Sequence, residues 1–404
     1  MAPRDDQLRT ARSAAELLRD ELPIGVMFVN TDLRVGGQER ALVEIVRGID
    51  RTKIRPVVVC LKEEGALAEV VRETGAPLYS RLLRHKFDLR VLRRLIDLIR
   101  RERIRVVCTI GCGDKMFWGR LAGRLAGVDA IVATIHKTRG ADGRAVIERA
   151  NRVLTPITDV FVAVAENAAR YLVEEEGLPR AKVVVIRNGV DVERFRGDGR
   201  EEARAALGLA PEDVAIVHVA VLRPEKGHDV LLRAARRVVD SCGDARFLLV
   251  GEGPRRAEIE RQIDELGLRA NVRLLGQRHD VERILAAGDV AVLASRDRVE
   301  TFPNSILEAM ASGLPCVCTR VGSLDEMIDD GVEGLLVSPE DSVKLADALT
   351  HLARDPSLRR SFGTHARARV ERDFPHELMI RTREQLFLQL VADATLRRRK
   401  KLEG

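Results

Sequence analysis

Two glutamates within residues 300–315 (ETFPNSILEAMASGLP) are the strongest candidates for chemistry in this sequence. Glu300 lies in a predicted loop, and Glu308 follows on a predicted helix after seven intervening residues. Because a carboxylate accepts paired hydrogen bonds from neighbouring hydroxyls, this pair would suit a sugar and a ribose. Two solvated glutamates on a surface helix would look the same, so the interpretation depends on the residues around them.

A second set of groups could hold phosphates. The predicted helix begins near Asn304, and the backbone N–H groups of Asn304, Ser305 and Ile306 suit an anion at a helix start. Upstream, Arg223 and Lys226 lie three residues apart, just before another predicted helix. Two cations so placed could hold a diphosphate and neutralise the charge that develops as it leaves.

Glycine-rich turns follow two of the predicted strands. Gly36-Gly37 precedes the helical run 38–47, where paired glycines let backbone N–H groups approach an anion, although a plain loop turn is the alternative. Gly251-Glu252-Gly253 lacks the third glycine of a dinucleotide fingerprint, because Arg256 stands there. The sequence has no G-x-x-x-x-G-K-[ST] motif. NAD binding and P-loop ATPase or kinase chemistry are therefore disfavoured.

Short apolar runs alternate with longer helical stretches along the chain. Each run of this kind indicates a parallel strand that is buried on both faces. The first series covers residues 24–30, 55–61, 104–110, 130–135, 159–164 and 182–186. The second covers residues 214–220, 246–250, 271–275, 289–294, 315–319 and 334–337. The predicted fold is α/β, with two Rossmann-like doubly wound domains facing across a cleft.

A length of 404 residues suits two domains, and strand character is lost across residues 190–212. We predict an N-terminal extension over 1–19, a first domain over 20–192, a second over 193–375 and a C-terminal helix over 376–404 that returns to the first domain.

Ligands of doubly wound sheets bind at the carboxyl ends of the strands. His136 follows strand 130–135, and Gly276-Gln277-Arg278 follows strand 271–275. The glycines, cations and carboxylates named above gather at the same strand ends, so a cleft between the domains would bring them to one ligand. A histidine after a strand can also be an ordinary hydrogen-bonded loop residue.

Charge and composition narrow the possible partners. The net charge is +6, and residues 81–105 hold ten basic and three acidic residues. This strip could attract an anionic acceptor or membrane surface, or it could be a solvated helix face. Aromatic residues make up 3%, which argues against nucleic-acid binding. The six cysteines lack zinc spacing and indicate buried, reduced thiols, so no metal site is predicted.

With these motifs in this order, the sequence resembles the retaining glycosyltransferases of the GT-B fold, family 4, over about residues 24–375. The most specific element is the pattern Glu, seven residues, Glu. Four further segments match the usual spacing and order of the family: VIRNGVDVERF (185–195), RPEKGHDVLLRA (223–234), VGEGP (250–254) and LLGQRHDVERILAAGDVAVLAS (274–295).

The resemblance implies a role for each candidate. The residue matching Glu300 contacts the donor sugar, the one matching Glu308 holds the ribose, and the one matching Lys226 binds the diphosphate. Gly37 would meet the phosphates or the acceptor side, and His136 would lie beside the transferred sugar.

Further donor contacts would come from Gly251 and from the GQR segment around Arg278. By the resemblance, that segment lies beside the nucleotide base of the donor. Two positions depart from the family. Many members have an arginine that binds the diphosphate where this chain has Val221, and Arg223 is the candidate substitute. Ala165 stands where many members have serine.

The implied activity is hexosyl transfer, with retention, from a UDP-, GDP- or ADP-sugar to a hydroxyl acceptor, with no metal and no cofactor. Glu300, His136 and Lys226 are the expected catalytic residues. The acceptor would be lipid-linked or a saccharide, in glycolipid, cell-envelope or exopolysaccharide synthesis. The expected location is the cytoplasm, with peripheral contact to an anionic membrane through the basic strip and the basic run 397–401.

Two other functions stay open at this point. A sugar-nucleotide epimerase on the same scaffold would release altered sugar nucleotide without an acceptor. A non-catalytic sugar-nucleotide-binding protein would show no turnover, which the presence of Glu300, Glu308 and Lys226 argues against.

Overall fold

The computed structural model describes residues 14, 16–34, 36–85, 88–111, 114–136, 151–296 and 300–403. The chain forms two compact units. One consists of Met1–Asn188 together with Glu377–Gly404, and the other of Gly189–His376. The division falls at 188/189 and 376/377, where the sequence suggested 192/193 and 375/376. Most of the predicted extension 1–19 lies outside the described residues.

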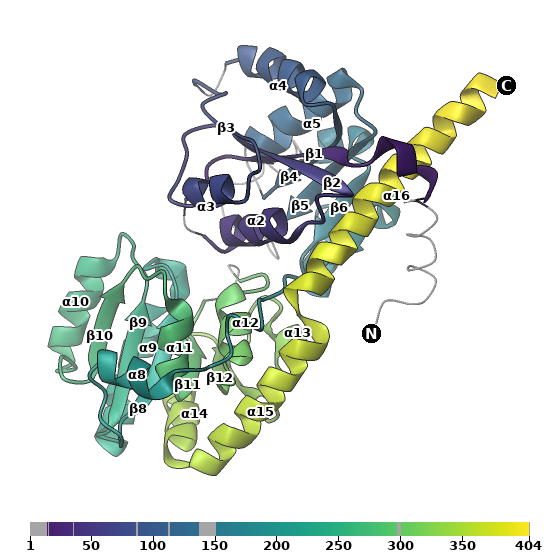
Figure 1. Ribbon diagram of the computed structural model, residues 1–404. Helices are drawn as coiled ribbons and strands as arrows, with labels where there is room; N and C mark the ends of the chain where they lie inside the picture. Colours follow the sequence, from purple (N-terminus) through teal and green to yellow (C-terminus); the bar gives the residue numbers. More distant parts are fainter. Residues whose placement is uncertain are drawn as a thin grey trace. The chain divides into compact units, whose positions relative to one another are not determined.

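The N-terminal unit is built on a seven-stranded parallel sheet in the order β3-β2-β1-β4-β5-β6-β7 (Figure 1). Its strands are β1 (Ile24–Asn30), β2 (Ile54–Cys60), β3 (Leu78–Tyr79), β4 (Ile104–Ile110), β5 (Ala130–Ile135), β6 (Val160–Ala163) and β7 (Val183–Val185). The two-residue edge strand β3 was not predicted, because it is half-buried and has no apolar run around it. The parallel α/β character was predicted and is confirmed.

Helices cover both faces of this sheet. They are α2 (Gly37–Gly48), α3 (Ala68–Glu73), α4 (Arg90–Arg101), α5 (Asp114–Ala126), α7 (Glu166–Glu174) and α16 (His376–Glu403). Successive side chains of β1 point to opposite faces. Val26 and Phe28 join a core with α2, α3 and α16, and Met27 and Val29 join a core with α4 and α5. Burial on both faces explains why the strands are continuous apolar runs.

Helix α16 brings the end of the chain back to the N-terminal unit. The ring of Phe387 packs edge-on against Phe28, with centroids 6.0 Å apart. Farther along, the buried carboxylate of Asp129 accepts hydrogen bonds from Arg105 and from Arg398 on α16. The helix continues through the basic run 397–401, because Arg398 is held by this ion pair.

The C-terminal unit contains a six-stranded parallel sheet in the order β10-β9-β8-β11-β12-β13 (Figure 1). The strands are β8 (Val214–Val219), β9 (Ala245–Val250), β10 (Val272–Gly276), β11 (Val290–Leu293), β12 (Cys316–Thr319) and β13 (Gly334–Val337). The helices are α8 (Arg200–Ala206), α9 (His228–Ser241), α10 (Arg256–Glu265), α11 (Val281–Ala287), α12 (Asn304–Ala311), α13 (Leu324–Met327), α14 (Ser342–Arg354) and α15 (Pro356–Asp373).

The core of the C-terminal unit lies between the sheet and helices α9, α10 and α14. Helices α11 and α12 pack on β8, β11 and β12. This strand order places β8 and β11 side by side at the centre, where the connection reverses direction. Ligands of doubly wound sheets bind at the carboxyl ends of such central strands. Across the described part of the chain, every helix is too short or too polar to cross a membrane.

Candidate active site

Glu300 and Lys226 form an ion pair at the carboxyl end of the C-terminal sheet. The side chain of Glu300 is 5% exposed and that of Lys226 is 21% exposed. The hydroxyl of Ser295 donates a hydrogen bond of 2.5 Å to the same carboxylate oxygen that the Lys226 ammonium contacts. A carboxylate held by two donors is fixed in direction, which is the property needed to orient a ligand hydroxyl.

The neighbouring strand β12 fixes the position of Glu300. Thr319 at the end of β12 donates a hydrogen bond of 2.6 Å from its hydroxyl to the carbonyl of Ser295. Gly322, with φ of 62°, lies against the backbone of Glu300, and a Cβ there would overlap the Glu300 carbonyl. Glycine is therefore required by both the backbone angle and the close approach.

A tight turn presents Lys226. Residues Pro224–Lys226 form one 3-10 turn after β8, and Gly227 ends it in the left-handed region with φ of 63°. A Cβ on Gly227 would overlap the carbonyl of Ala294 at the end of β11. This contact holds Lys226 beside the loop that carries Glu300. Arg223 begins the turn, and its side chain is exposed.

Arg296 ties this turn to the loop after β11. Its guanidinium donates to the carbonyl of Pro224 at 2.6 Å and to the carboxylate of Asp229 at 2.8 Å. Its backbone N–H donates to the carbonyl of Glu225 at 2.8 Å. Sequence reasoning missed Arg296 and Asp229, since their partners are distant in sequence. These hydrogen bonds join the turn that carries Lys226 to the start of the loop after β11.

Two buried histidines lie behind this edge. His218 on β8 and His228 at the start of α9 are both 0% exposed, and their rings meet edge-on with centroids 4.9 Å apart. The Nδ1–H of His218 donates to the carbonyl of Val292 at 2.8 Å. Burial lowers the pKa of His218 to about 4 and that of His228 to about 2. Both rings are therefore neutral at pH 7.

The start of α12 supplies Glu308 and the expected phosphate donors. Pro303 is the N-cap of this helix, and Glu308 is 9% exposed. The backbone N–H of Ile306 donates to the carbonyl of Pro303 at 3.1 Å, so this group is already used within the first turn. Asn304, Ser305 and Ile306 stay the predicted phosphate donors at the helix start.

Glycines close the gap between the loops after β8 and β9. Gly251 has φ of 145°, and a Cβ on it would overlap the carbonyl of Ala220. Gly253 approaches the carbonyl of Leu222 in the same way, at 2.5 Å from an ideal Cβ. Glycine at these positions is thus required by packing around Val221, the residue that replaces the family arginine.

Arg278 lies in the loop after the edge strand β10. Its guanidinium makes an ion pair with Asp280, with hydrogen bonds of 2.8 and 2.7 Å. The loop that carries Arg278 begins at Gly276, whose carbonyl accepts the backbone N–H of Gly251 at 2.8 Å.

Gly37 and His136 belong to the N-terminal unit. Gly37 is the exposed first residue of α2, and nothing lies within 4 Å of where its Cβ would be. Packing does not require glycine here, which leaves room for a ligand. His136 follows β5 directly and is half-buried. Both residues lie at the carboxyl end of their sheet, where the sequence placed them.

No cluster of three or more potential metal-binding side chains occurs among the described residues. The cysteines within that part of the chain are free and buried, namely Cys60, Cys108, Cys242, Cys316 and Cys318. Burial raises the pKa of Cys108 to about 11 and that of Cys316 well above its usual range. Cys112 lies outside the described residues.

Comparisons with known families match both halves of the chain. Residues 35–194 match the family described as Glycosyltransferase Family 4, and residues 213–355 match the family described as Glycosyl transferases group 1. The second match contains Lys226, Glu300 and Glu308.

The chain is also similar to characterised enzymes and to solved structures. The N-acetyl-alpha-D-glucosaminyl L-malate synthase of Bacillus anthracis is 27% identical over 76% of this chain and 80% of its own length. The UDP-Gal:alpha-D-GlcNAc-diphosphoundecaprenol alpha-1,3-galactosyltransferase of Escherichia coli is 28% identical over 74% and 80%. The solved structure of Anabaena HepE in complex with UDP and glucose has a TM-score of 0.78 at 21% identity, over 88% of this chain and 97% of that one. At that identity the structural likeness shows the fold.

Proposed function

We propose that this chain transfers a sugar with retention of configuration, without a metal ion, onto an anionic acceptor. The chain belongs to the family 4 glycosyltransferases of the GT-B fold and takes the sugar from a nucleotide sugar. The observation that carries the proposal is the ion pair of Lys226 with the buried Glu300, which Ser295 also holds. This pair lies at the centre of the C-terminal sheet edge, where doubly wound folds bind ligands.

The ion pair suggests how the donor is received. The Lys226 ammonium exchanges its contact with Glu300 for the diphosphate of the donor, which carries more charge. The Glu300 carboxylate is then available to hydroxyls of the donor sugar, while Ser295 keeps it in place. Glu308 holds the ribose. Gly251 and Arg278 keep their assigned places near the donor as part of the proposal.

Catalysis rests on charge that grows during the reaction. The bond between the sugar and the diphosphate breaks, the acceptor oxygen forms a bond on the same face, and the acceptor proton passes to a phosphate oxygen. Lys226, the exposed Arg223 and the N–H groups at the start of α12 stabilise the departing diphosphate. His136 would lie beside the transferred sugar.

Metal independence follows from the same groups. A diphosphate leaving group needs its charge neutralised, and the cationic side chains Lys226 and Arg223 supply that charge at the strand ends. Full activity is expected after treatment with EDTA. Loss of activity that Mg²⁺ or Mn²⁺ restores would contradict this part of the proposal.

The acceptor is proposed to be anionic. The two relatives act, by their names, on L-malate and on a diphosphoundecaprenol-linked sugar, both of which carry negative charge. Residues 1–190 of this chain hold 34 Lys and Arg against 25 Asp and Glu. We therefore assign acceptor binding to the N-terminal unit.

Peripheral contact with an anionic membrane is a further part of the proposal. Helix α4 carries Arg93 and Arg100 on the surface, and its N-cap residue Leu89 is 73% exposed. Binding to vesicles that contain phosphatidylglycerol, and its loss when α4 arginines are replaced by glutamine, would support this location. Equal binding to neutral vesicles would contradict it.

The test of the site is the substitution Glu300→Gln. Glutamine keeps the shape and can still accept from Ser295, but it removes the charge and its ion pair with Lys226. Transfer is expected to fall by about 10²–10³, because an oriented charge at the reacting centre is lost. The matched control is Glu260→Gln, on the exposed face of α10, where activity should not change.

Two measurements complete the test. A thermal-shift screen with UDP-, GDP- and ADP-sugars identifies the donor, since binding to the folded state raises the melting temperature. Product analysis by NMR then reports the anomeric configuration. Wild-type turnover by Glu300→Gln would refute the site, and release of altered sugar nucleotide without an acceptor would indicate an epimerase instead.

A further inference from the structure

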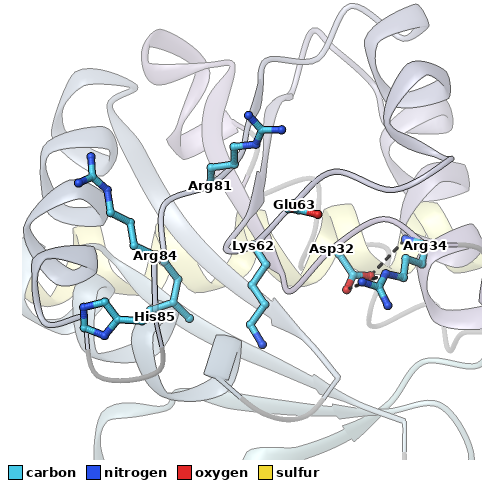
Figure 2. A pocket seen from close by; sticks show the side chains of 8 residues that line it. Asp32, Arg34, Lys62, Glu63, Arg81, Arg84 and His85 are labelled. Carbon is cyan, nitrogen blue, oxygen red and sulfur yellow. Dashed lines mark hydrogen bonds and ion pairs between the residues drawn. The ribbon is translucent and has the colours of Figure 1, made fainter.

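A polar cavity of about 710 Å³ lies at the strand ends of the N-terminal unit (Figure 2). Its walls come from the loops that follow β1, β2 and β3. The permanently charged cations that line it are Arg34, Lys62, Arg81 and Arg84. Two carboxylates also line it, so the net charge is +2 when His85 is left aside. We call these four cations and the space between them the basic pocket.

Backbone hydrogen bonds hold the walls of the basic pocket. The N–H of Lys62 donates to the carbonyl of Thr31 at 2.9 Å, and the N–H of Arg81 donates to the carbonyl of Lys62 at 2.8 Å. The N–H of Leu83 donates to the carbonyl of Leu61 at 2.7 Å. The pairing of β1, β2 and β3 therefore continues past the strand ends. The cations project from a fixed frame and not from loose surface loops.

Arg81 occupies an unusual backbone conformation. Its φ of 58° lies in the left-handed region, which costs free energy for a residue with a Cβ and favours glycine or asparagine. Backbone conformations of this kind persist where surrounding structure imposes them, and they concentrate at functional sites. Figure 2 shows the side chains of Arg81 and Arg84 extending from the same loop.

A second layer of charge supports that loop. Arg94 on α4 donates to the carbonyl of Leu82 at 2.6 Å and to the carboxylate of Asp88 at 2.7 Å. Asp88, 5% exposed, in turn accepts the backbone N–H of Arg84 at 3.2 Å. The hydrogen bond from Arg94 lowers the pKa of Asp88 to about 2, so this carboxylate is charged at all physiological pH values. Arg94 positions the pocket and does not line it.

The chemistry of the lining selects a small anion with more than one charge. Lys62 lies between His85 on one side and the pair of Asp32 and Arg34 on the other (Figure 2). Among the described residues that line the pocket, His85 is the only one with an aromatic ring that a nucleotide base could stack on. Arginine forks and an ammonium suit phosphate oxygens, and nearby carboxylates can accept hydroxyls of the same ligand.

We propose that the basic pocket binds the phosphate or diphosphate of the acceptor, an assignment that rests on the proposed transferase function. The phosphate group anchors the acceptor in the N-terminal unit, away from the hydroxyl that reacts. The pocket thereby selects phosphorylated acceptors over neutral saccharides.

The test is isothermal titration of the full chain with inorganic pyrophosphate and, separately, with inorganic phosphate. It uses a Lys226→Gln background, so that the donor diphosphate site contributes little. The pocket variant is Arg81→Gly, since glycine suits φ of 58° and removes the whole side chain, guanidinium included, without straining the backbone. Arg84→Gln is a second, independent variant. The matched control is Arg47→Gln on α2, whose side chain is 49% exposed and lies outside the pocket.

Each pocket variant is expected to weaken anion binding at least tenfold, and Arg47→Gln is expected to leave it unchanged. Tighter binding of pyrophosphate than of phosphate would assign a diphosphate, as on a lipid carrier, and the reverse order would assign a monoester. Equal weakening by Arg47→Gln, or undiminished binding by both pocket variants, would overturn the proposal. Donor binding by thermal shift is measured in parallel, so a failed transferase assignment is recognised separately.

Discussion

Replacing His228 should flatten the acid dependence of stability. The ring is fully buried and meets His218 edge-on, and its pKa falls from 6.5 to about 2 because burial disfavours the charged form. The native state therefore keeps this ring neutral, while the unfolded chain binds a proton below pH 6.5. The stability contributed by His228 is complete above that pH and is lost as the pH falls.

The magnitude follows from the pKa difference. Because the unfolded chain binds a proton at His228, the free energy of unfolding falls by about 1.4 kcal/mol for each pH unit between pH 6.5 and pH 5. The whole decrease is about 2 kcal/mol. His218, with a pKa near 4, adds a similar loss in the same range. Carboxylates with lowered pKa, such as Asp50 and Asp88 at about 2, titrate mainly below this range and do not obscure the effect.

The assay is urea unfolding of His228→Phe and His228→Leu at pH 7.5, 6 and 5, compared with the unsubstituted chain. Neither nitrogen of His228 has a hydrogen-bond partner among the described residues. Replacing the ring with an apolar side chain therefore breaks no hydrogen bond. Between pH 7.5 and pH 5, the free energy of unfolding of both variants should fall by about 2 kcal/mol less than that of the unsubstituted chain. The exposed His279→Gln is the control and should keep the full dependence. An unchanged dependence in both His228 variants would refute a buried, neutral ring.

Two further substitutions test contacts that stabilise the C-terminal and the N-terminal unit. Gly227→Ala should abolish the thermal shift with the donor and lower the unfolding free energy of the C-terminal unit by a few kcal/mol, because the new Cβ overlaps the carbonyl of Ala294. A normal donor shift would show that this turn does not need glycine. Asp129→Asn should lower the urea stability of the N-terminal unit by about 2 kcal/mol, since it removes the charged acceptor of Arg105 and Arg398 while Arg105 keeps its ion pair with Glu21. Unchanged hydrogen exchange around Arg398 would argue against the role of this ion pair.

The strands of both sheets could be predicted because each is buried on both faces and reads as an apolar run. Residues 24–30 and 104–110 match β1 and β4 from end to end. The edge strand β3 could not be found in this way, because Leu78 and Tyr79 are only half-buried and follow no run. Periodicity reports burial, so it fails where a strand is short and partly exposed.

The candidate site was predictable where residues lie in one motif and not where they meet across the sheet. Glu300, Glu308 and Lys226 stand in segments whose spacing is informative, and Lys226 and Glu300 are in contact. The supporting groups Arg296 and His218 find partners more than seventy residues away, at Pro224 and Val292. Only the strand order, which places β8 beside β11, brings these segments together.

Helix α16 is the last element to be synthesised, although it packs on the first strand, and this affects folding on the ribosome. The apolar face of β1 around Phe28 is complete only when Phe387 packs on it, and 358 residues separate the two in the sequence. The nascent polypeptide must therefore carry an uncovered hydrophobic surface while the whole C-terminal unit is translated and folds. Premature termination anywhere before residue 387 leaves that surface open, and such truncated products are expected to be targets for chaperones and proteases.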